Sequence, residues 1–281
     1  IRMSYRITKI LNHNSFMGIE SKNNQECLIM GKGVAFGKKV GQTVSVTGDA
    51  RVYSLKELTD RGGAKEIIKS VSPLCLELAN EVLNQAEKEF GKVDRSILFT
   101  MADHHLDFAV RRIQNGEQIS NPLTDDIRIM FYKEYKVAGC IRDLLKEKLG
   151  IRIDEHEIGY IALHVHAAIV DENVSQAMEI ARTVRECICM VEEETGKSID
   201  VMSLSYNRLM NHVRYMVARA IHGEKLKMSL NDYMSVKFPG PYMTAEKICR
   251  KMEKSLKLPI PDIEIGYLAM HLERMMDREE E

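Results

Sequence analysis

The octapeptide EIGYIALH at residues 157–164 decides how this chain is organised, because a near copy, EIGYLAMH, occupies residues 264–271. The same offset of 107 residues carries His105 onto His212 without any gap. Self-similarity at a fixed period is the sequence signature of a repeated structural unit. We therefore infer a duplicated domain, and each copy carries two histidines that are 59 residues apart.

The repeated region is expected to be all-α. From Pro73 onward, apolar residues recur at three- and four-residue steps and charged residues fill the opposite face, which is the periodicity of amphipathic helices. Proline is rare there, as long helices require. The sequence predicts two homologous helical bundles of about five helices each, at residues 72–176 and 177–279.

The first part of the chain has a different pattern. Between residues 3 and 57, short apolar segments alternate with turns rich in Asn, Ser and Gly, which predicts a small antiparallel all-β domain. A sheet of about 50 residues buries only a thin core, so this domain is expected to dimerise. Residues 58–71 are predicted to be a linker, with a hinge at Asp60-Arg61-Gly62-Gly63.

Composition argues against membrane and secreted classes. Hydrophobic residues make up 44% of the 281 residues, and no apolar run approaches the length of a membrane span. The N-terminus lacks a secretory pattern. The six cysteines show no zinc-ribbon or redox spacing, and scattered thiols fit a reducing compartment. A cytoplasmic protein without membrane insertion is therefore expected.

The net charge of −1 is unevenly distributed. Residues 1–57 hold nine Lys and Arg residues against four acidic ones, and a basic module suggests a polyanionic partner. Its turns concentrate residue types that suit RNA, because amides read base edges, an aromatic ring stacks, lysine meets phosphate and glycine lets a backbone approach. The alternative is an ordinary asparagine turn followed by a glycine bulge with solvated lysines. The residues concerned include Asn12, Asn14, Gly31, Lys32 and Phe36.

The four equivalent histidines admit several interpretations. A lone histidine is usually a partly buried, hydrogen-bonded core residue, but packing alone would accept another side chain in at least one copy. Two nitrogens per domain without a nearby Asp, Glu or Cys motif are too few for a closed zinc site. Acid–base catalysis needs a partner nucleophile or carboxylate pair, which is not evident. These histidines are His105, His164, His212 and His271.

Reversible phosphorylation fits these histidines better. Imidazole is nucleophilic at neutral pH, and its phosphoramidate passes readily to another imidazole. Each modified histidine would gain a nearly dianionic group, which arginine binds by charge-assisted hydrogen bonds. The arginines expected to do so are Arg111, Arg112, Arg214 and Arg219.

Taken together, these segments resemble the transcriptional antiterminators of the BglG/SacY type, from Met3 to about Met276. The resemblance rests on LNHN at residues 11–14, MGKGVAF at residues 30–36 and the paired octapeptides. The forms GKGVAFGKK and IALHVHAA are most similar to the glucose-type members. Such proteins consist of a small RNA-binding co-antiterminator domain followed by two phosphotransferase-system regulation domains. The resemblance thus implies the same multidomain fold class, an antiparallel all-β domain followed by two all-α bundles.

The resemblance also implies a function and its sites. A homodimer would bind a hairpin in a leader mRNA and prevent an overlapping terminator from forming. The phosphocarrier HPr and a sugar-specific enzyme II would phosphorylate His105, His164, His212 and His271. No enzymatic activity, cofactor or metal is implied. The residues implied to contact RNA are Asn14, Gly31, Lys32 and Phe36, with Asn12 in support.

Three positions depart from the family pattern. The family usually has Asp directly before the first histidine, whereas His104 fills that place here and Asp103 lies one position earlier, so His104 stays an alternative to His105. His13 stands where Asn is usual. Lys32 stands where Arg is often found, which gives a point charge instead of a planar fork.

Two rival functions remain open. A DNA-binding activator could carry the same regulatory domains, but residues 1–60 show no helix-turn-helix pattern. A histidine-centred metalloenzyme is the other, and metal analysis of the purified protein would detect it.

Overall fold

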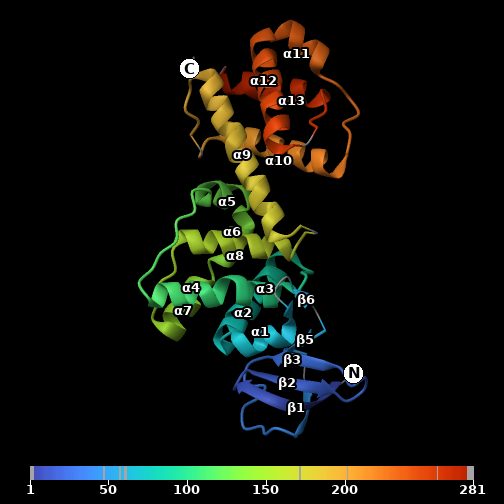
Figure 1. Ribbon diagram of the computed structural model, residues 1–281, viewed down its shortest axis with the longest axis vertical. Helices are drawn as coiled ribbons and strands as arrows, with labels where there is room; N and C mark the ends of the chain where they lie inside the picture. The colour runs from blue at the N-terminus through green and yellow to red at the C-terminus, as the bar shows by residue number, and fades with distance from the viewer. Residues whose placement is uncertain are drawn as a thin grey trace. The chain divides into compact units, whose positions relative to one another are not determined.

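The computed structural model describes residues 3–46, 48–56, 58–59, 62–170, 172–200, 202–257 and 259–276. An N-terminal antiparallel sheet is followed by helices, which confirms the predicted fold class (Figure 1). Two compact units form, one from Ile1–Ser120 with Lys133–Asn173 and one from Asn121–Tyr132 with Val174–Glu281. The hinge predicted at residues 60–63 lies partly outside the described residues.

The N-terminal sheet has the strand order β4-β1-β2-β3-β5, and all its pairings are antiparallel. A two-residue turn at positions 13–14 joins β1 to β2 and sets Asn12 opposite Ser15. Tyr5 and Ile7 lie two positions apart on one face and pack with Phe16 in a buried core. The strands are β1 (Met3–Asn12), β2 (Ser15–Glu20), β3 (Glu26–Met30), β4 (Thr43–Val46) and β5 (Arg51–Ser54).

Inside the predicted linker, residues 58–71, the structure contains β6 (Leu58–Thr59), β7 (Gly62–Gly63) and the helix α1 (Ala64–Ser70). The helix α2 (Pro73–Phe90) follows directly. Its N-cap is Ser72, whose side chain accepts a hydrogen bond from the Leu74 amide, and proline occupies the first turn. The described part of the predicted linker therefore ends in a helix directly before α2.

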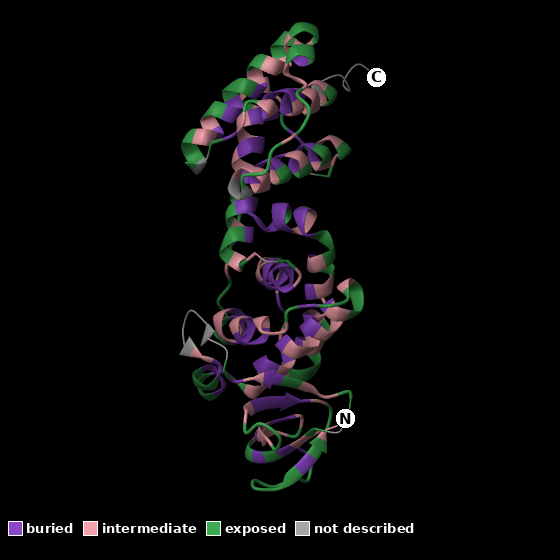
Figure 2. Cartoon of the chain, turned by 90° about the vertical axis from the view of Figure 1, so that its right-hand side faces the viewer, coloured by how far each residue is buried: buried purple, intermediate pink, exposed green. Residues whose placement is uncertain are grey.

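The rest of the first unit surrounds α8 (Glu155–Ala167), which is buried along most of its length. Asp154 caps α8 by accepting a hydrogen bond from the Glu157 amide. Figure 2 shows buried positions along the inner sides of the helices and exposed positions outside, as amphipathic patterning requires. The other helices are α3 (Ile97–Met101), the π-helical turn η1 (Ala102–Leu106), α4 (Asp107–Gln114), α6 (Tyr132–Ala138) and α7 (Ile141–Leu149).

The second unit includes α5 (Thr124–Met130), although this helix lies within residues 72–176 of the chain. The Tyr206 hydroxyl donates a 2.5 Å hydrogen bond to Asp126 of α5, and both side chains are buried. The predicted domain limits follow the order of the chain, whereas α5 is grouped with the second compact unit. The other helices are α9 (Val174–Thr195), α10 (Leu204–His222), α11 (Asn231–Lys237), α12 (Pro239–Leu256) and α13 (Ile263–Met276).

None of the described helices combines the length and apolar character needed to cross a bilayer.

Candidate RNA interface and phosphorylation sites

The turn between β1 and β2 and the loop after β3 form one hydrogen-bonded surface. The Asn14 carbonyl accepts a hydrogen bond from the Gly31 amide at 2.9 Å, and its side-chain oxygen accepts one from the Gly33 amide at 2.8 Å. Gly33 has φ of +66°, a region that glycine adopts without strain. A Cβ atom at Gly31 would lie 3.1 Å from the Cβ of Ala50, so a larger residue there would have to displace Ala50 by a few tenths of an ångström.

Phe36 is the exposed aromatic of this surface. Its side chain is 68% exposed and meets the His13 ring edge to face, with ring centroids 5.3 Å apart. Lys32 is exposed on the same loop. A solvent-facing ring held beside fixed amides and a lysine can stack a base while the cation meets phosphate.

Asn12 has a supporting role in the turn. Its side-chain oxygen accepts hydrogen bonds from the Asn14 amide at 2.9 Å and from the Ser15 hydroxyl at 2.8 Å. This bonding of an Asn side chain to the backbone two residues on fixes the turn conformation. The structure therefore brings Asn12 and Asn14 together with the loop that carries Gly31, Lys32 and Phe36.

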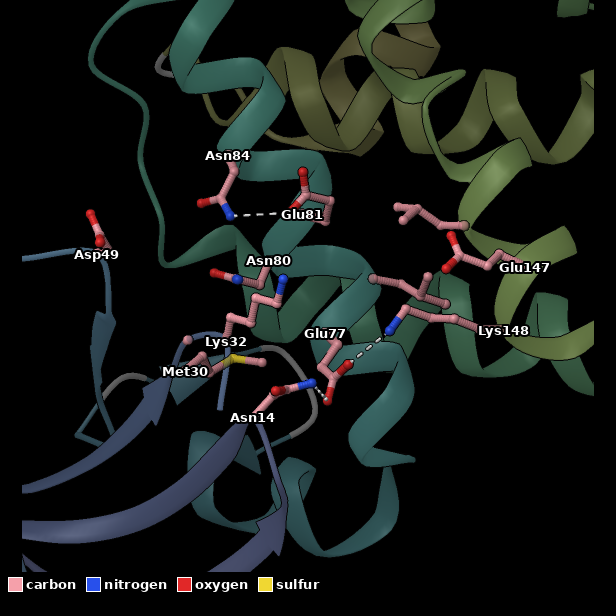
Figure 3. Close-up of a pocket in the computed structure, with 13 residues that line it drawn as sticks. Asn14, Met30, Lys32, Asp49, Glu77, Asn80, Glu81, Asn84, Glu147 and Lys148 are labelled. Atoms are coloured by element: carbon pink, nitrogen blue, oxygen red, sulfur yellow. Dashed lines mark hydrogen bonds and ion pairs between the residues drawn. The ribbon is translucent and has the colours of Figure 1, made fainter. Parts of the chain in front are cut away.

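The same surface faces a helix of the first unit. The Glu77 carboxylate of α2 accepts hydrogen bonds from the side-chain amides of Asn12 at 2.5 Å and Asn14 at 3.4 Å, and it pairs with Lys148 of α7 at 3.2 Å. A pocket of about 450 Å³ lies between the module and these helices (Figure 3). Its polar lining includes Asn14, Lys32, Asp49, Glu77, Asn80, Glu81, Asn84, Glu147 and Lys148.

A polar cluster around Arg95 anchors the edge strand β5 to α2. Arg95 donates hydrogen bonds to the Tyr53 hydroxyl at 2.7 Å and to the side-chain oxygen of Asn80 at 2.9 Å. It also pairs with Glu87 at 3.2 Å, and Arg51 of β5 pairs with the same carboxylate. The packing of β5 on α2 therefore uses residues other than Glu77.

In the first unit, His105 and His164 lie side by side. Their ring centroids are 6.1 Å apart, and the Tyr160 ring lies 5.2 Å from that of His105. His105 belongs to the π-helical turn η1, and π turns inside α-helices are frequent at functional sites. Both histidines are buried, with exposed fractions of 7% and 5%.

A buried carboxylate bridges His105 and an arginine. The Nε2 atom of His105 lies 2.9 Å from a carboxylate oxygen of Glu157 and 3.2 Å from its backbone carbonyl, so it carries a hydrogen. Arg112 donates to the same carboxylate at 2.8 Å. Burial raises the pKa of Glu157, but the hydrogen bonds from His105 and Arg112 outweigh it and lower the pKa below its usual value. Glu157 is therefore ionised at neutral pH.

His164 is neutral under the same conditions. Burial, with smaller contributions from the neighbouring His105 and His104, lowers its pKa from 6.5 to about 3. Its Nδ1 atom is buried and has no hydrogen-bond partner among the described residues. A neutral imidazole keeps a lone pair on one ring nitrogen, which is the nucleophilic form.

The second unit repeats the histidine pair and the arginine–glutamate pair in α10 and α13, but here the Nε2 atom of His212 has no hydrogen-bond partner among the described residues. His212 and His271 stack with ring centroids 4.7 Å apart. Burial, followed by the charges of His271 and Arg219, lowers the pKa of His212 to about 3. Arg219 makes two hydrogen bonds of 2.8 Å to Glu264, which is buried. Both histidines line a pocket of about 390 Å³.

The four arginines expected to bind a phosphoryl group already interact with other groups of the protein. Arg112 and Arg219 are bound by Glu157 and Glu264, and Arg111 pairs with Asp107 at 2.8 Å. Arg214 lies over the Tyr215 ring and donates a hydrogen bond to the Met130 carbonyl. A phosphoryl group would have to compete for these cations. The two glutamates open the duplicated octapeptides, so the repeat itself was the signal that pointed to them.

His104 occupies a different environment from His105. Its Nε2 atom lies 3.6 Å from an Asp103 carboxylate oxygen and is otherwise buried without a hydrogen-bond partner in the described part of the chain. The ring contact with His164 is made by His105. His105 is therefore placed as His212 is in the other unit.

Comparison with known proteins gives matches along nearly the whole chain. The PRD domain model matches residues 77–168 and 185–275, and the CAT RNA binding domain model matches residues 5–61. Protein GlcT of Staphylococcus haemolyticus (strain JCSC1435) is 28% identical over 271 residues, which are 95% of each chain. The beta-glucoside operon antiterminator of Dickeya chrysanthemi is 27% identical over 275 residues, 96% of each.

One solved structure is also similar. The crystal structure of GlcT CAT-PRDI superposes with a TM-score of 0.50 at 27% sequence identity. The match covers 59% of this chain and 99% of that one.

Proposed function

Because the chain belongs to the BglG/SacY-type family of transcriptional antiterminators, with one CAT RNA binding domain and two PRD domains, we propose that it binds a leader-mRNA hairpin as a homodimer. Binding would prevent an overlapping terminator from forming upstream of sugar phosphotransferase-system genes. The single observation that carries the proposal is the exposed Phe36 ring beside the fixed turn at Asn14.

The RNA contacts follow from the chemistry of this surface. Asn14 and Lys32 offer hydrogen-bond donors, Phe36 offers a stacking face, and Gly31 keeps the loop close to the sheet. Asn12 holds the turn in shape. The rival of a DNA-binding activator finds no support, because the described part of residues 3–56 forms strands and turns.

We further propose that HPr and a sugar-specific enzyme II phosphorylate His105, His164, His212 and His271. The support is their pairing in both units and the neutral state of His164 and His212. A metalloenzyme is disfavoured, since within the described ranges no group of three or more His, Cys, Asp or Glu side chains is placed to hold a metal ion.

Phosphorylation of His105 would act on the buried Glu157. Because Nε2 donates its hydrogen to Glu157, the lone pair that attacks phosphorus is on Nδ1. The product adds nearly two negative charges to a ring that contacts an ionised carboxylate. Repulsion would loosen the Arg112–Glu157 pair or recruit a cation from another subunit. Either outcome changes packing in the first PRD domain.

Full-length chains with His105→Asp or His164→Asp are expected to shift the monomer–dimer equilibrium and the RNA affinity in parallel, because an aspartate brings a negative charge into the same buried cluster. Analytical ultracentrifugation measures association, and RNA titration measures affinity. The proposed coupling is wrong if RNA affinity changes while both association state and dimer shape stay constant. His156→Ala in the same α8 helix is the control variant.

A further inference from the structure

We propose that the acidic face of α2 is a binding surface for the RNA-binding turn, so that Glu77 and RNA compete for the same amide donors. This inference rests on the proposed function, because it presumes that the turn binds RNA. The interaction surface is formed by Glu77, Glu81 and Glu87 of α2, and its partner is the amide and basic surface of the N-terminal module.

The contact at Glu77 engages the Asn14 side-chain amide, which RNA would need, and the amide of Asn12, which supports the same turn. One carboxylate oxygen accepts the side-chain N–H groups of both Asn12 and Asn14, at 2.5 and 3.4 Å. Figure 3 shows the contact with Asn14 and the bond from Lys148 to the other oxygen. The Glu77 side chain is only 14% exposed, so it is enclosed by these partners. A donor that is committed to Glu77 is not available to a base edge or a phosphate oxygen.

Charge makes this contact a competitor of RNA. Asp49, Glu81 and Glu147 line the same pocket as Glu77, while its cations are Lys32 and Lys148. RNA is a polyanion whose affinity depends on the cations that it meets. A phosphate brought to Asn14 and Lys32 would enter this acidic pocket, so RNA and α2 do not occupy the turn together.

The contacts between β5 and α2 allow the RNA-binding turn to move away from Glu77 while the N-terminal module stays bound to α2. Arg95 binds Tyr53 of β5 and Asn80 of α2 through hydrogen bonds, and Arg51 pairs with Glu87. These interactions do not involve Glu77. Release of Asn12 and Asn14 therefore leaves the module attached to α2 at the other end of the surface.

The position of α2 also connects this contact to the first phosphorylation site. α2 packs against η1, the turn that contains His105. The Ser72 amide at the start of α2 donates a 3.3 Å hydrogen bond to Asp107, two residues after His105. A change in the conformation of η1 can therefore shift α2 through direct side-chain packing, and α2 is the helix that contacts the RNA-binding turn.

The test compares Glu77→Ala with Glu89→Ala in the full-length chain. Both remove one negative charge from α2, but Glu89 is exposed and does not line the pocket. The probe is an in vitro transcript of a leader RNA that contains the proposed hairpin and its overlapping terminator. Glu77→Ala is expected to bind this RNA about tenfold more tightly than wild type, the scale of one charge-assisted hydrogen bond. Glu89→Ala is expected to match wild type.

Two outcomes would overturn the inference. Equal affinity of Glu77→Ala and wild type would show that α2 does not compete, and weaker binding would show that Glu77 positions the amides for RNA. Side-chain amide resonances of Asn12 and Asn14 provide a second readout, since RNA added to wild type should shift them as Glu77→Ala does. Absence of RNA binding by wild type and both variants would instead contradict the proposed function.

Discussion

Replacing Phe36 by Ala in the full-length chain is expected to weaken leader-RNA binding by about 1–3 kcal/mol, or roughly 5- to 150-fold. The ring is 68% exposed, so most of its surface is open to a base. Because Phe36 lies outside the buried core of the module, the substitution should leave thermal stability nearly unchanged. Fluorescence titration with labelled leader RNA measures the loss.

Val40→Ala is a matched control for this experiment. Val40 is 63% exposed and belongs to the same module. An equal loss of affinity in both variants would show that exposed apolar area in general, and not stacking on Phe36, supports the complex. An unchanged affinity of Phe36→Ala would remove Phe36 from the RNA site.

Replacement of His105, His164, His212 and His271 by Ala is expected to abolish phosphoryl labelling by HPr or the sugar-specific enzyme II. The label on wild type should be labile in acid and stable in alkali, as a phosphoramidate is. The physical basis is that burial keeps His164 and His212 neutral and therefore nucleophilic. Mass spectrometry of intact chains measures the number of phosphoryl groups transferred.

The same experiment tests the assignment of sites. His156→Ala, a variant of another histidine on α8, should be labelled as wild type is. Label that persists at His104 or His166 in the fourfold variant would show that the positions are wrongly assigned. A chain that keeps only His164 should accept phosphate equally well from about pH 8 to about pH 6, since a pKa of about 3 leaves it unprotonated over that range.

The duplicated octapeptide predicted two homologous domains with equivalent histidines, and the spacing of apolar residues predicted that both are helical. It did not predict the π turn at Ala102–Leu106, because an inserted turn leaves no periodic signal in so short a segment. It also did not predict the binding of Arg112 by Glu157, although both residues recur in the second copy. The repeat identifies equivalent residues in the two copies, but only the three-dimensional structure shows which of these residues are in contact.

Contacts between residues that are far apart in the sequence could not be predicted either. Asn14 and Glu77 are 63 residues apart in the chain, and none of the sequence patterns links them. The structure places α2 directly against the RNA-binding turn. The grouping of α5 with the second unit is similar, because it depends on the buried pair of Asp126 and Tyr206.

The most direct test of the central claim is a titration of the full-length chain with the leader transcript at rising salt. We expect selective binding of the RNA over duplex DNA of the same sequence, and a loss of at least roughly tenfold in affinity between about 50 and 200 mM salt. Phosphorylated HPr or enzyme II should alter this affinity in wild type but not in the chain that lacks His105, His164, His212 and His271. A preference for duplex DNA, or binding insensitive to salt, would contradict the account.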